Sequence, residues 1–511
     1  MVEGTKKLKK RFCFLHPDMC IGGAEQFVLN LARASLNVGG GNSTNNAVDI
    51  YTAHCDLNCC FQDLKPPDGI FCNRVHVYGG WIPKKFGGFT ALCTHLRLIY
   101  LSIIVLFFLP SIDDDEEIIY VVDVVPSPFL LLTNALLLHL SCLFSKNKNK
   151  SNKSTTIYVC NFPDKLLTQD TINGQTQLTN KKSIWKRLYR TLIDLLEESS
   201  MPYADLISIS SKFTMGQVKQ TFPFLDSSKL HVIYPPIRNH NDETEEKVIL
   251  PTTTTKPIVS LNRFERKKNV SVLLKAYAKL IQNHQNKDTN DNSVFPPLVI
   301  AGGYDIHNME NVEHHQELVS LANDLNIPSS QIKFCKNISD HERKDMLQNA
   351  LCVCYTPKWE HFGIVPLEAM YAGTPVIAWN CGGPKETVVH QQTGYLVDLS
   401  SSKDNSDEEE AQSWTTALQY MMNNSNDTQW KQRTKQHVQK HFAWDTFVLT
   451  WEEHISKAQS NSMKRHEMAR KRLKMIIPML FGILLLFIVV MVVIMHSIFL
   501  SHSETTEFQE L

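Results

Sequence analysis

The stretch "WEHFGIVPLEAMYAGTPVIAWNCGGPKE" (359–386) contains two glutamates, a helix pattern and an apolar strand pattern. The apolar run 351–357 before it and the run 374–380 inside it are typical of buried strands. Strand, helix and strand in this order predict two parallel strands joined by a crossover helix. Glu360 and Glu368 stand eight positions apart in this connection, beside glycines that allow the backbone to approach a ligand. The stretch therefore predicts a binding loop at the end of a parallel strand.

The same alternation of strand and helix patterns recurs along most of the chain. Near-continuous apolar runs are typical of parallel strands that helices cover on both faces. They fall into two series, which predict an α/β protein with two doubly wound, Rossmann-like domains. The first series comprises 11–16, 48–54, 118–125, 156–162, 206–210 and 230–236, and the second comprises 257–264, 297–303, 332–338, 351–357 and 374–380.

A polar, threonine-rich segment separates the two series and is typical of a linker. The sequence predicts six parts in all. They are an N-terminal Rossmann-like domain (1–238), the linker (239–256), a C-terminal Rossmann-like domain (257–445), a returning helix with a basic juxtamembrane segment (446–475), a transmembrane helix (476–500) and a lumenal tail (501–511).

The composition excludes several classes of function. The 511 residues include 52 basic and 52 acidic side chains, so no basic excess indicates a nucleic-acid-binding protein. The 13 cysteines show no paired spacing of a structural zinc site, and they indicate free thiols in a reducing compartment. No GxxxxGK[ST] run is present, which argues against a P-loop nucleotidase.

Three apolar segments concern membranes. Residues 476–500 carry no charge and exceed the roughly 20 residues that cross a bilayer core, which predicts a transmembrane helix. The segment 464–474 before it is rich in Lys and Arg and the tail after it has none, so the large N-terminal part is predicted to be cytosolic. The runs 98–110 and 128–144 are shorter, and they fit either core helices or helices that lie in the membrane interface.

Two further clusters lie where a predicted strand ends. Gly22 and Gly23 precede a helix pattern, and backbone amides at such a helix start can bind an anion. A tight turn without a ligand would explain the two glycines equally well. In the C-terminal series, four cations follow the run 257–264 and suit a diphosphate, although a solvated basic turn is the alternative. These cations are Arg263, Arg266, Lys267 and Lys268.

The opening stretch combines the same elements with carboxylates. Its helix carries Pro366 in the first turn, where proline is tolerated, and the amides of Gly363, Ile364 and Val365 are predicted to face a phosphate. A carboxylate can accept hydrogen bonds from two sugar hydroxyls, so Glu360 and Glu368 can hold two sugars. The alternative for such a pair is a capping or salt-bridge role.

The motifs "HPD…IGGAE", "NRFERKKN", "AGGYD", "EHFGIVPLEAM", "PVIA" and "GGPKET" occur in this order and cover most of 10–400. The spacing of Glu360 and Glu368 resembles that of retaining GT-B glycosyltransferases of family four. The set of motifs together resembles the α-1,3/1,6-mannosyltransferases of dolichol-linked oligosaccharide assembly. This resemblance implies two Rossmann-like domains that face each other across a cleft, with the acceptor bound on the N-terminal side and a nucleotide sugar on the C-terminal side.

The resemblance assigns roles to individual residues. Gly22 and Gly23 would lie near the donor diphosphate, which Arg263 and Lys268 would neutralise. Glu360 would lie near the transferred mannose. The remaining residues implied for donor binding are Glu368 at the ribose hydroxyls, the amides of Gly363, Ile364 and Val365 at the phosphates, and Gly302 of the "AGGYD" motif.

One position departs from the family pattern. The family usually has a histidine before "FPD", whereas this chain has Asn161 in "CNFPDKLLT". Asparagine can hydrogen-bond a sugar hydroxyl but cannot take up a proton at neutral pH. A retaining reaction on one face makes less demand on a base, because the leaving phosphate oxygen can accept the proton. Asn161 is therefore predicted to be a catalytic residue beside Glu360, Arg263 and Lys268.

The resemblance also implies substrates and a location. Mannose would pass from GDP-mannose to a dolichol-diphosphate-linked mannosyl-chitobiose, first in α-1,3 and then in α-1,6 linkage, for N-glycan precursor synthesis. The enzyme would lie in the endoplasmic reticulum membrane with its domains in the cytosol, with no metal and no cofactor, and a complex with other dolichol-pathway glycosyltransferases remains open. Two alternatives are a membrane glycosyltransferase with another donor, such as UDP-N-acetylglucosamine, and a non-catalytic scaffold that binds sugar nucleotides.

Overall fold

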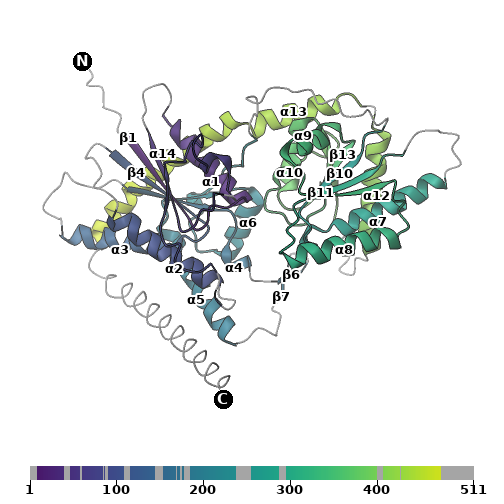
Figure 1. The fold of residues 1–511 in the computed structure, drawn as a ribbon. Coiled ribbons are helices and arrows are strands. Elements are labelled where there is room, and N and C mark those ends of the chain that lie inside the picture. Colours follow the sequence, from purple (N-terminus) through teal and green to yellow (C-terminus); the bar gives the residue numbers. More distant parts are fainter. Residues whose placement is uncertain are drawn as a thin grey trace, which may run out of the picture.

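Two parallel β-sheets, each covered by helices on both faces, make up the described fold (Figure 1). The structure is a computed structural model. It describes residues 9–39, 46–57, 60–84, 86, 90–108, 116–143, 154–167, 170–172, 175–177, 184–237, 255–286, 295–399, 407–425 and 427–472. The predicted transmembrane helix 476–500 and the tail 501–511 lie outside these residues, as does most of the predicted linker 239–256.

The N-terminal sheet has seven parallel strands in the order β3-β2-β1-β4-β5-β8-β9. Their bounds are β1 (Lys9–His16), β2 (Ala47–Thr52), β3 (Val75–Val77), β4 (Glu116–Asp123), β5 (Ser154–Cys160), β8 (Leu206–Ile209) and β9 (Leu230–Val232). A separate antiparallel pair joins β6 (Asp170–Ile172) to β7 (Gln175–Gln177). Because all seven strands of the sheet run the same way, their carboxyl ends meet at one edge.

Helices cover both faces of this sheet, as the alternation of side chains on the central strand requires. Phe12 and Phe14 pack on the side of α1 (Gly23–Leu36), whereas Cys13 and Leu15 pack on the side of α2 and α3. The other helices of this half are α2 (Thr90–Ile103) with its π-helical extension η2 (Ile104–Phe108), α3 (Ser127–Leu143), α4 (Asp164–Leu167), α5 (Ile184–Ser200) and α6 (Lys212–Thr221), with short 3₁₀ turns η1 (Gln62–Leu64), η3 (Met201–Tyr203) and η4 (Ser227–Lys229).

The C-terminal sheet has six parallel strands in the order β12-β11-β10-β13-β14-β15. Their bounds are β10 (Ile258–Leu261), β11 (Leu298–Gly302), β12 (Ile332–Lys336), β13 (Cys352–Tyr355), β14 (Val376–Trp379) and β15 (Gly394–Val397). The helices are α7 (Val270–Gln285), α8 (Met309–Asp324), α9 (Asp340–Asn349), α10 (Ile364–Ala372), α11 (Pro384–Thr387), α12 (Asp407–Asn423) and α13 (Trp430–His441), with the 3₁₀ turn η5 (Arg266–Lys268). Cys352 and Cys354 pack on the side of α7 and α12, and Val353 and Tyr355 on the side of α10 and α13.

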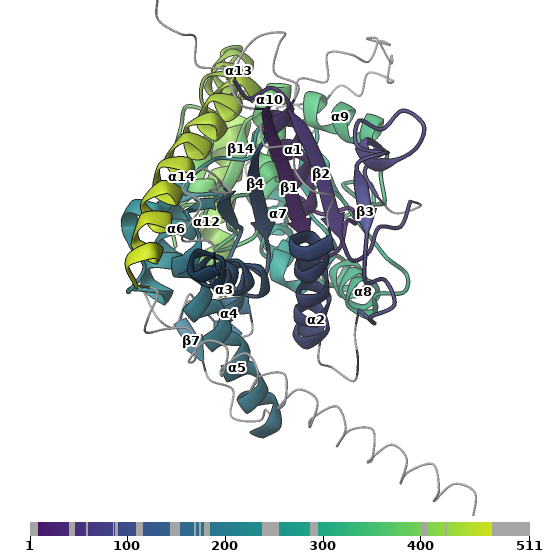
Figure 2. The same ribbon diagram turned by 90° about the vertical axis from the view of Figure 1, so that its left-hand side faces the viewer.

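The last described helix, α14 (Trp444–Arg472), leaves the C-terminal half and returns to the N-terminal sheet (Figures 1 and 2). Phe447 and Trp451 belong to the same buried cluster as Phe12 and Phe14 of β1. The Trp451 indole donates a hydrogen bond of 2.9 Å to Ser35 Oγ on α1. Helix α14 is therefore part of the core of the N-terminal half, although it comes last in the described chain.

Helix α2 and its extension η2 form the one described helix long and apolar enough to cross a membrane, and 44% of its most apolar window is buried. Leu98, Leu101 and Val105 lie in the core, whereas Phe107 and Phe108 are 57% and 71% exposed. The predicted apolar run 98–110 is thus a core helix along its first part, with an exposed aromatic end.

The strand predictions are confirmed, since each of the eleven predicted runs contains a strand. Two short edge strands, β3 and β15, were not predicted, nor was the β6–β7 pair. Two doubly wound domains follow from this topology, as the sequence predicts.

Candidate active site

Glu360 and Lys268 form an ion pair at the carboxyl edge of the C-terminal sheet. Lys268 Nζ lies 2.6 Å from Glu360 Oε2, and the two side chains are 13% and 25% exposed. The Thr356 hydroxyl donates a 2.6 Å hydrogen bond to the Lys268 carbonyl, and the Gly383 amide donates one of 2.7 Å to the Glu360 carbonyl. Both residues are thus held through their backbones as well as through their charges. The sequence predicts that they share a site, and the structure brings them into contact although they lie 92 positions apart in the chain.

The charge state of Glu360 follows from this pair. Burial raises the pKa of Glu360, but the Lys268 charge and hydrogen bond outweigh burial and set the pKa below its ordinary value. The site therefore holds an ionised carboxylate and a lysine ammonium before any ligand binds.

Glu368 lies on α10 and pairs with a residue that the sequence analysis did not identify. Its carboxylate accepts a hydrogen bond from Arg343 of α9. Burial raises the pKa of Glu368, and the Arg343 charge opposes that effect. Burial raises the pKa of the Tyr355 hydroxyl well above the ordinary value, and the charges of Glu360 and then Glu368 add to this shift. The charges of both predicted carboxylates thus act on one buried tyrosine.

The basic cluster divides into two parts. Arg266 forms ion pairs of 3.0 Å with Glu313 and 2.5 Å with Glu317 on α8, which draw it away from the Lys268–Glu360 pair. Arg263 is 64% exposed and lies 3.1 Å from Glu265, and its charge also acts on the Tyr355 hydroxyl. The expectation that four cations serve one diphosphate stays a prediction, and for Arg266 the acidic surface of α8 would compete with such a ligand. Of the two residues implied for the diphosphate, Lys268 contacts Glu360 and Arg263 pairs with Glu265.

Helix α10 begins beside this group. Gly363 is its N-cap with a φ of +81°, and no side chain caps the helix. The amides of Gly363, Ile364 and Val365 therefore start a helix whose positive dipole end suits an anion. Pro366 lies in the first turn, as predicted.

Gly302, which the resemblance implies for donor binding, has a packing role as well. It ends β11 next to the end of β10, and a Cβ there would lie 1.8 Å from the Asn262 carbonyl oxygen. Any larger residue would push these two strand ends apart, and Arg263 follows Asn262 directly.

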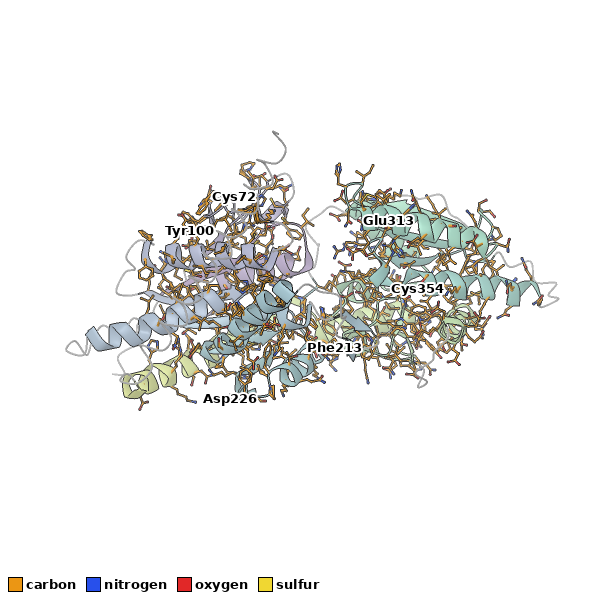
Figure 3. The ribbon with its side chains drawn as sticks, turned by 90° about the horizontal axis from the view of Figure 1, so that it is seen from below. Cys72, Tyr100, Phe213, Asp226, Glu313 and Cys354 are labelled. Atoms are coloured by element: carbon orange, nitrogen blue, oxygen red, sulfur yellow. The ribbon has the colours of Figure 1, made fainter. Side chains whose placement is uncertain are left out.

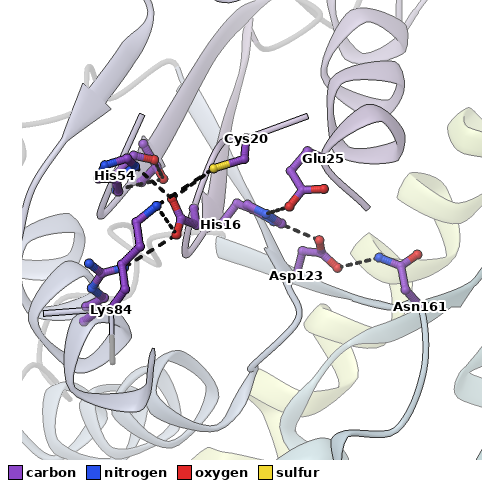
Figure 4. Close-up of polar contacts among 10 residues, drawn as sticks. His16, Cys20, Glu25, His54, Lys84, Asp123 and Asn161 are labelled. Carbon is purple, nitrogen blue, oxygen red and sulfur yellow. Dashed lines mark hydrogen bonds and ion pairs between the residues drawn. The ribbon is translucent and has the colours of Figure 1, made fainter. Parts of the chain in front are cut away.

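In the N-terminal half, four polar residues form a network at the carboxyl edge of the sheet (Figure 4). His16 Nδ1 lies 2.9 Å from Asp123 Oδ2, and the Asn161 amide donates a 3.0 Å hydrogen bond to Asp123 Oδ1. His16 Nε2 lies 3.6 Å from Glu25 on α1. His16 and Asp123 are each 1% exposed. Asn161 is therefore oriented by a buried pair that the sequence analysis did not identify.

This network fixes a charge in the core. Burial lowers the pKa of His16, but the hydrogen bonds and charges of Asp123 and Glu25 outweigh burial and raise it to about 9. The ordinary histidine value is about 6.5. The protonated imidazole thus stabilises the fold fully below that ordinary value, and the contribution is lost as the pH rises through about 9.

The backbone beside Asp123 is strained. Val124 has a φ of +65°, a left-handed conformation that a β-branched residue rarely adopts. The Val125 amide donates a 2.8 Å hydrogen bond to the Asp123 carbonyl, which closes a tight turn directly after β4. Strain of this kind persists where surrounding structure enforces it, as at binding sites.

The two halves meet next to both groups. The Phe162 ring stacks on His361 with centroids 3.8 Å apart, so the neighbours Asn161 and Glu360 flank one interdomain contact. The Ser211 hydroxyl donates a 2.6 Å hydrogen bond to the His361 carbonyl. Figure 3 shows Phe213, on the first turn of α6, at the junction of the two halves. The structure thus brings Asn161 of one half to the junction that carries Glu360 in the other.

A Gly22→Ala substitution is expected to separate Glu25 from His16, because the added Cβ would lie 2.3 Å from Glu25 Oε2. The imidazole then loses one of its two acidic partners, and its pKa is expected to fall by about one unit. An NMR pH titration of labelled histidine, with His16→Gln for assignment, measures this shift. Gly23→Ala is the matched control, since a Cβ there meets nothing within 4 Å. Equal His16 pKa values in the two variants would contradict the role of Gly22.

Comparisons with known proteins agree with this geometry. The family model "Glycosyl transferases group 1" matches residues 241–436. The chain is 35% identical to "Alpha-1,3/1,6-mannosyltransferase ALG2" of Dictyostelium discoideum over 78% of this chain and 87% of that protein. It is 34% identical to the protein of the same name in Homo sapiens, over 76% of this chain and 84% of that protein.

Solved structures show the same fold at low identity. A sucrose-phosphate synthase from Thermosynechococcus elongatus aligns with a TM-score of 0.57 and 18% identity, over 90% of this chain and 100% of that one. A glycosyltransferase from Rickettsia africae aligns with a TM-score of 0.54 and 15% identity, over 91% and 99% of the two chains. The two sheets therefore adopt the GT-B arrangement.

Proposed function

Because this chain belongs to the family of α-1,3/1,6-mannosyltransferases, we propose that it transfers mannose from GDP-mannose to a dolichol-diphosphate-linked mannosyl-chitobiose in N-glycan precursor synthesis. The product would carry mannose first in α-1,3 and then in α-1,6 linkage. The Lys268–Glu360 contact carries this proposal, since it provides a cation for a phosphate and a carboxylate for a sugar hydroxyl in one place.

The donor would lie against the C-terminal half. Arg263 and Lys268 would neutralise the diphosphate, and the first amides of α10 would bind its oxygens. Glu360 would contact the mannose hydroxyls. Glu368 would reach the ribose, and its partner Arg343 would orient the carboxylate.

The reaction would proceed on one face of the mannose. The bond from the anomeric carbon to the phosphate oxygen breaks as the bond to the acceptor oxygen forms, and the acceptor proton passes to the leaving phosphate oxygen. Lys268 and Arg263 stabilise the charge that grows on departing GDP. Closure of the two halves excludes water and holds the acceptor hydroxyl at the anomeric carbon. No step in this scheme uses a metal or a cofactor.

The acceptor implies a membrane. We infer that residues 476–500 span the endoplasmic reticulum bilayer and that the basic segment 464–474 keeps both domains on the cytosolic side. The apolar α2–η2 helix with its exposed Phe107 and Phe108 suits contact with a lipid.

Incubation of the anchored protein with GDP-mannose and the lipid-linked acceptor, followed by analysis of product linkages, tests the proposal. Both α-1,3 and α-1,6 mannosides are expected, together with one GDP per mannose transferred. UDP-N-acetylglucosamine serves as the competing donor. Preferred use of that donor would contradict the proposal, and GDP-mannose binding without turnover would indicate a non-catalytic scaffold.

A further inference from the structure

An exposed tryptophan stands on a rigid turn after β3. Trp81 is 75% exposed, and its ring meets Tyr100 of α2 edge-on with centroids 5.7 Å apart. The Ile82 amide donates a 3.0 Å hydrogen bond to the Gly79 carbonyl and closes the turn. The buried Arg97 donates one of 2.9 Å to the Ile82 carbonyl and anchors the turn to α2. The backbone of the turn is thus held against α2, and the Trp81 ring contacts Tyr100 while most of its surface remains open to solvent.

A charged group lies next to this turn (Figure 4). Asp18 lies 3.0 Å from Lys84 Nζ, 3.0 Å from His54 Nδ1 and 3.7 Å from Arg97 Nη1. The Met19 amide donates a 2.9 Å hydrogen bond to the His54 carbonyl, which joins the two loops that carry these residues. The Asp18, His54 and Lys84 side chains are each partly exposed, and Asp18 and Lys84 can contact a ligand, whereas His54 Nδ1 is buried against Asp18.

The position of this group in the fold favours ligand binding. Asp18, His54 and Trp81 follow the carboxyl ends of β1, β2 and β3, and ligands of parallel α/β sheets bind at this edge. Asp18 comes two residues after His16, whose partner Asp123 orients Asn161. Figure 4 shows both polar groups in a single close-up. Arg97 and Tyr100, which contact the turn of Trp81, belong to α2, and the same helix ends in the exposed Phe107 and Phe108.

We propose that Trp81, Asp18, His54 and Lys84 form a carbohydrate subsite that receives a sugar ring of the lipid-linked acceptor. A pyranose places the apolar face of its ring on an aromatic side chain, while a carboxylate and an ammonium take up its hydroxyls. This inference rests on the proposed function. Trp81 contacts Tyr100, and Phe107 and Phe108 are exposed further along the same helix, so in this proposal the inner sugars and then the lipid of the acceptor follow its reactive sugar towards these rings.

A metal ion is a less favoured occupant. Ligand atoms of Asp18, Cys20 and His54 lie within 4.8 Å of one another, which is close enough to share a metal. Lys84 Nζ already lies 3.0 Å from Asp18 and 4.0 Å from Cys20 Sγ. The ammonium therefore supplies the positive charge that a metal would bring, and a cation would have to displace it.

Trp81→Ala and Lys84→Met test the subsite in the full-length enzyme. Each is expected to raise the KM for the lipid-linked acceptor about tenfold, with the KM for GDP-mannose unchanged. Phe224→Ala is the control, because Phe224 is 49% exposed and contacts Phe222, outside the proposed subsite. Thermal stability is expected to match the wild type in all three variants, since the replaced side chains are exposed. An unchanged acceptor KM in both subsite variants would overturn the proposal.

A second measurement separates this inference from the proposed function. Calorimetric titration with the lipid-free trisaccharide mannosyl-chitobiose, and with maltotriose for comparison, reports sugar binding whether or not mannose is transferred. Preferred binding of mannosyl-chitobiose that Trp81→Ala abolishes would support the subsite even in an inactive enzyme. Equal binding of mannosyl-chitobiose by Trp81→Ala and the wild type would overturn it.

Discussion

Lys268→Ala is expected to lower the rate of mannose transfer by about a hundredfold to a thousandfold at saturating donor, as the loss of one preorganised charge at a reaction centre does. Lys268 Nζ contacts Glu360 at 2.6 Å and is only 13% exposed, so no solvent cation replaces it at low cost. The variant also leaves the Glu360 carboxylate without its main partner. The rate of mannose transfer is therefore expected to fall more than the unfolding temperature. GDP release measures the rate, and thermal unfolding measures the stability.

Lys279→Ala is the matched control for this experiment. Lys279 also forms a lysine–glutamate pair, 2.7 Å long with Glu408, but on the helix surface between α7 and α12. Its loss should leave turnover unchanged within a factor of two. Turnover of Lys268→Ala within threefold of the wild type would remove Lys268 from the reaction.

Arg465→Met is expected to destabilise the N-terminal half by about 3–5 kcal/mol, because it leaves a buried charge without its partner. Arg465 of α14 contacts both oxygens of Asp205, at 2.7 and 2.9 Å, and the Asp205 side chain is 1% exposed. Burial raises the pKa of Asp205, and the Arg465 charge is the main effect that opposes this. Without the arginine, the Asp205 carboxyl can take up a proton and become neutral. The difference in unfolding free energy between the variant and the wild type should therefore decrease as the pH falls.

Thermal unfolding at several pH values measures this effect. Lys457→Met serves as the control, since Lys457 pairs with Glu453 on the exposed side of the same helix and should contribute little. An Arg465→Met variant that unfolds at the control's temperature would show that the Asp205 pair does not hold α14.

The sequence predicts most of the sheets because their strands are long apolar runs. β3 and β15 escape prediction because polar residues or glycines closely flank VHV (75–77) and GYLV (394–397), so neither stands in a longer apolar run and a neighbouring strand defines each. The Lys268–Glu360 contact could be predicted because the two residues follow β10 and β13 of one parallel sheet. The carboxyl ends of such strands lie at one edge of the sheet. The expected donor and catalytic roles remain predictions.

Other contacts depend on tertiary structure that no local pattern contains. His16 and Asp123 are 107 positions apart, and neither stands in a motif of charged residues that would indicate the pair. Arg343, which pairs with Glu368, lies on the polar helix α9, whose sequence contains no pattern that indicates a binding site. Arg266 has the same local sequence context as Lys268. It pairs with Glu313 and Glu317 because the acidic surface of α8 lies beside it in the folded protein.

The return of α14 to the first sheet has a consequence for biosynthesis. On the ribosome, β9 completes the seven strands roughly two hundred residues before α14 emerges. At about 5–20 residues per second this leaves an interval of roughly ten to forty seconds. Throughout that time the apolar surface that Trp451 and Phe447 later cover is exposed to solvent on the nascent polypeptide and can bind other apolar surfaces. Chaperone demand should consequently peak late in translation, and a premature stop codon before 444 should yield a product that cells degrade.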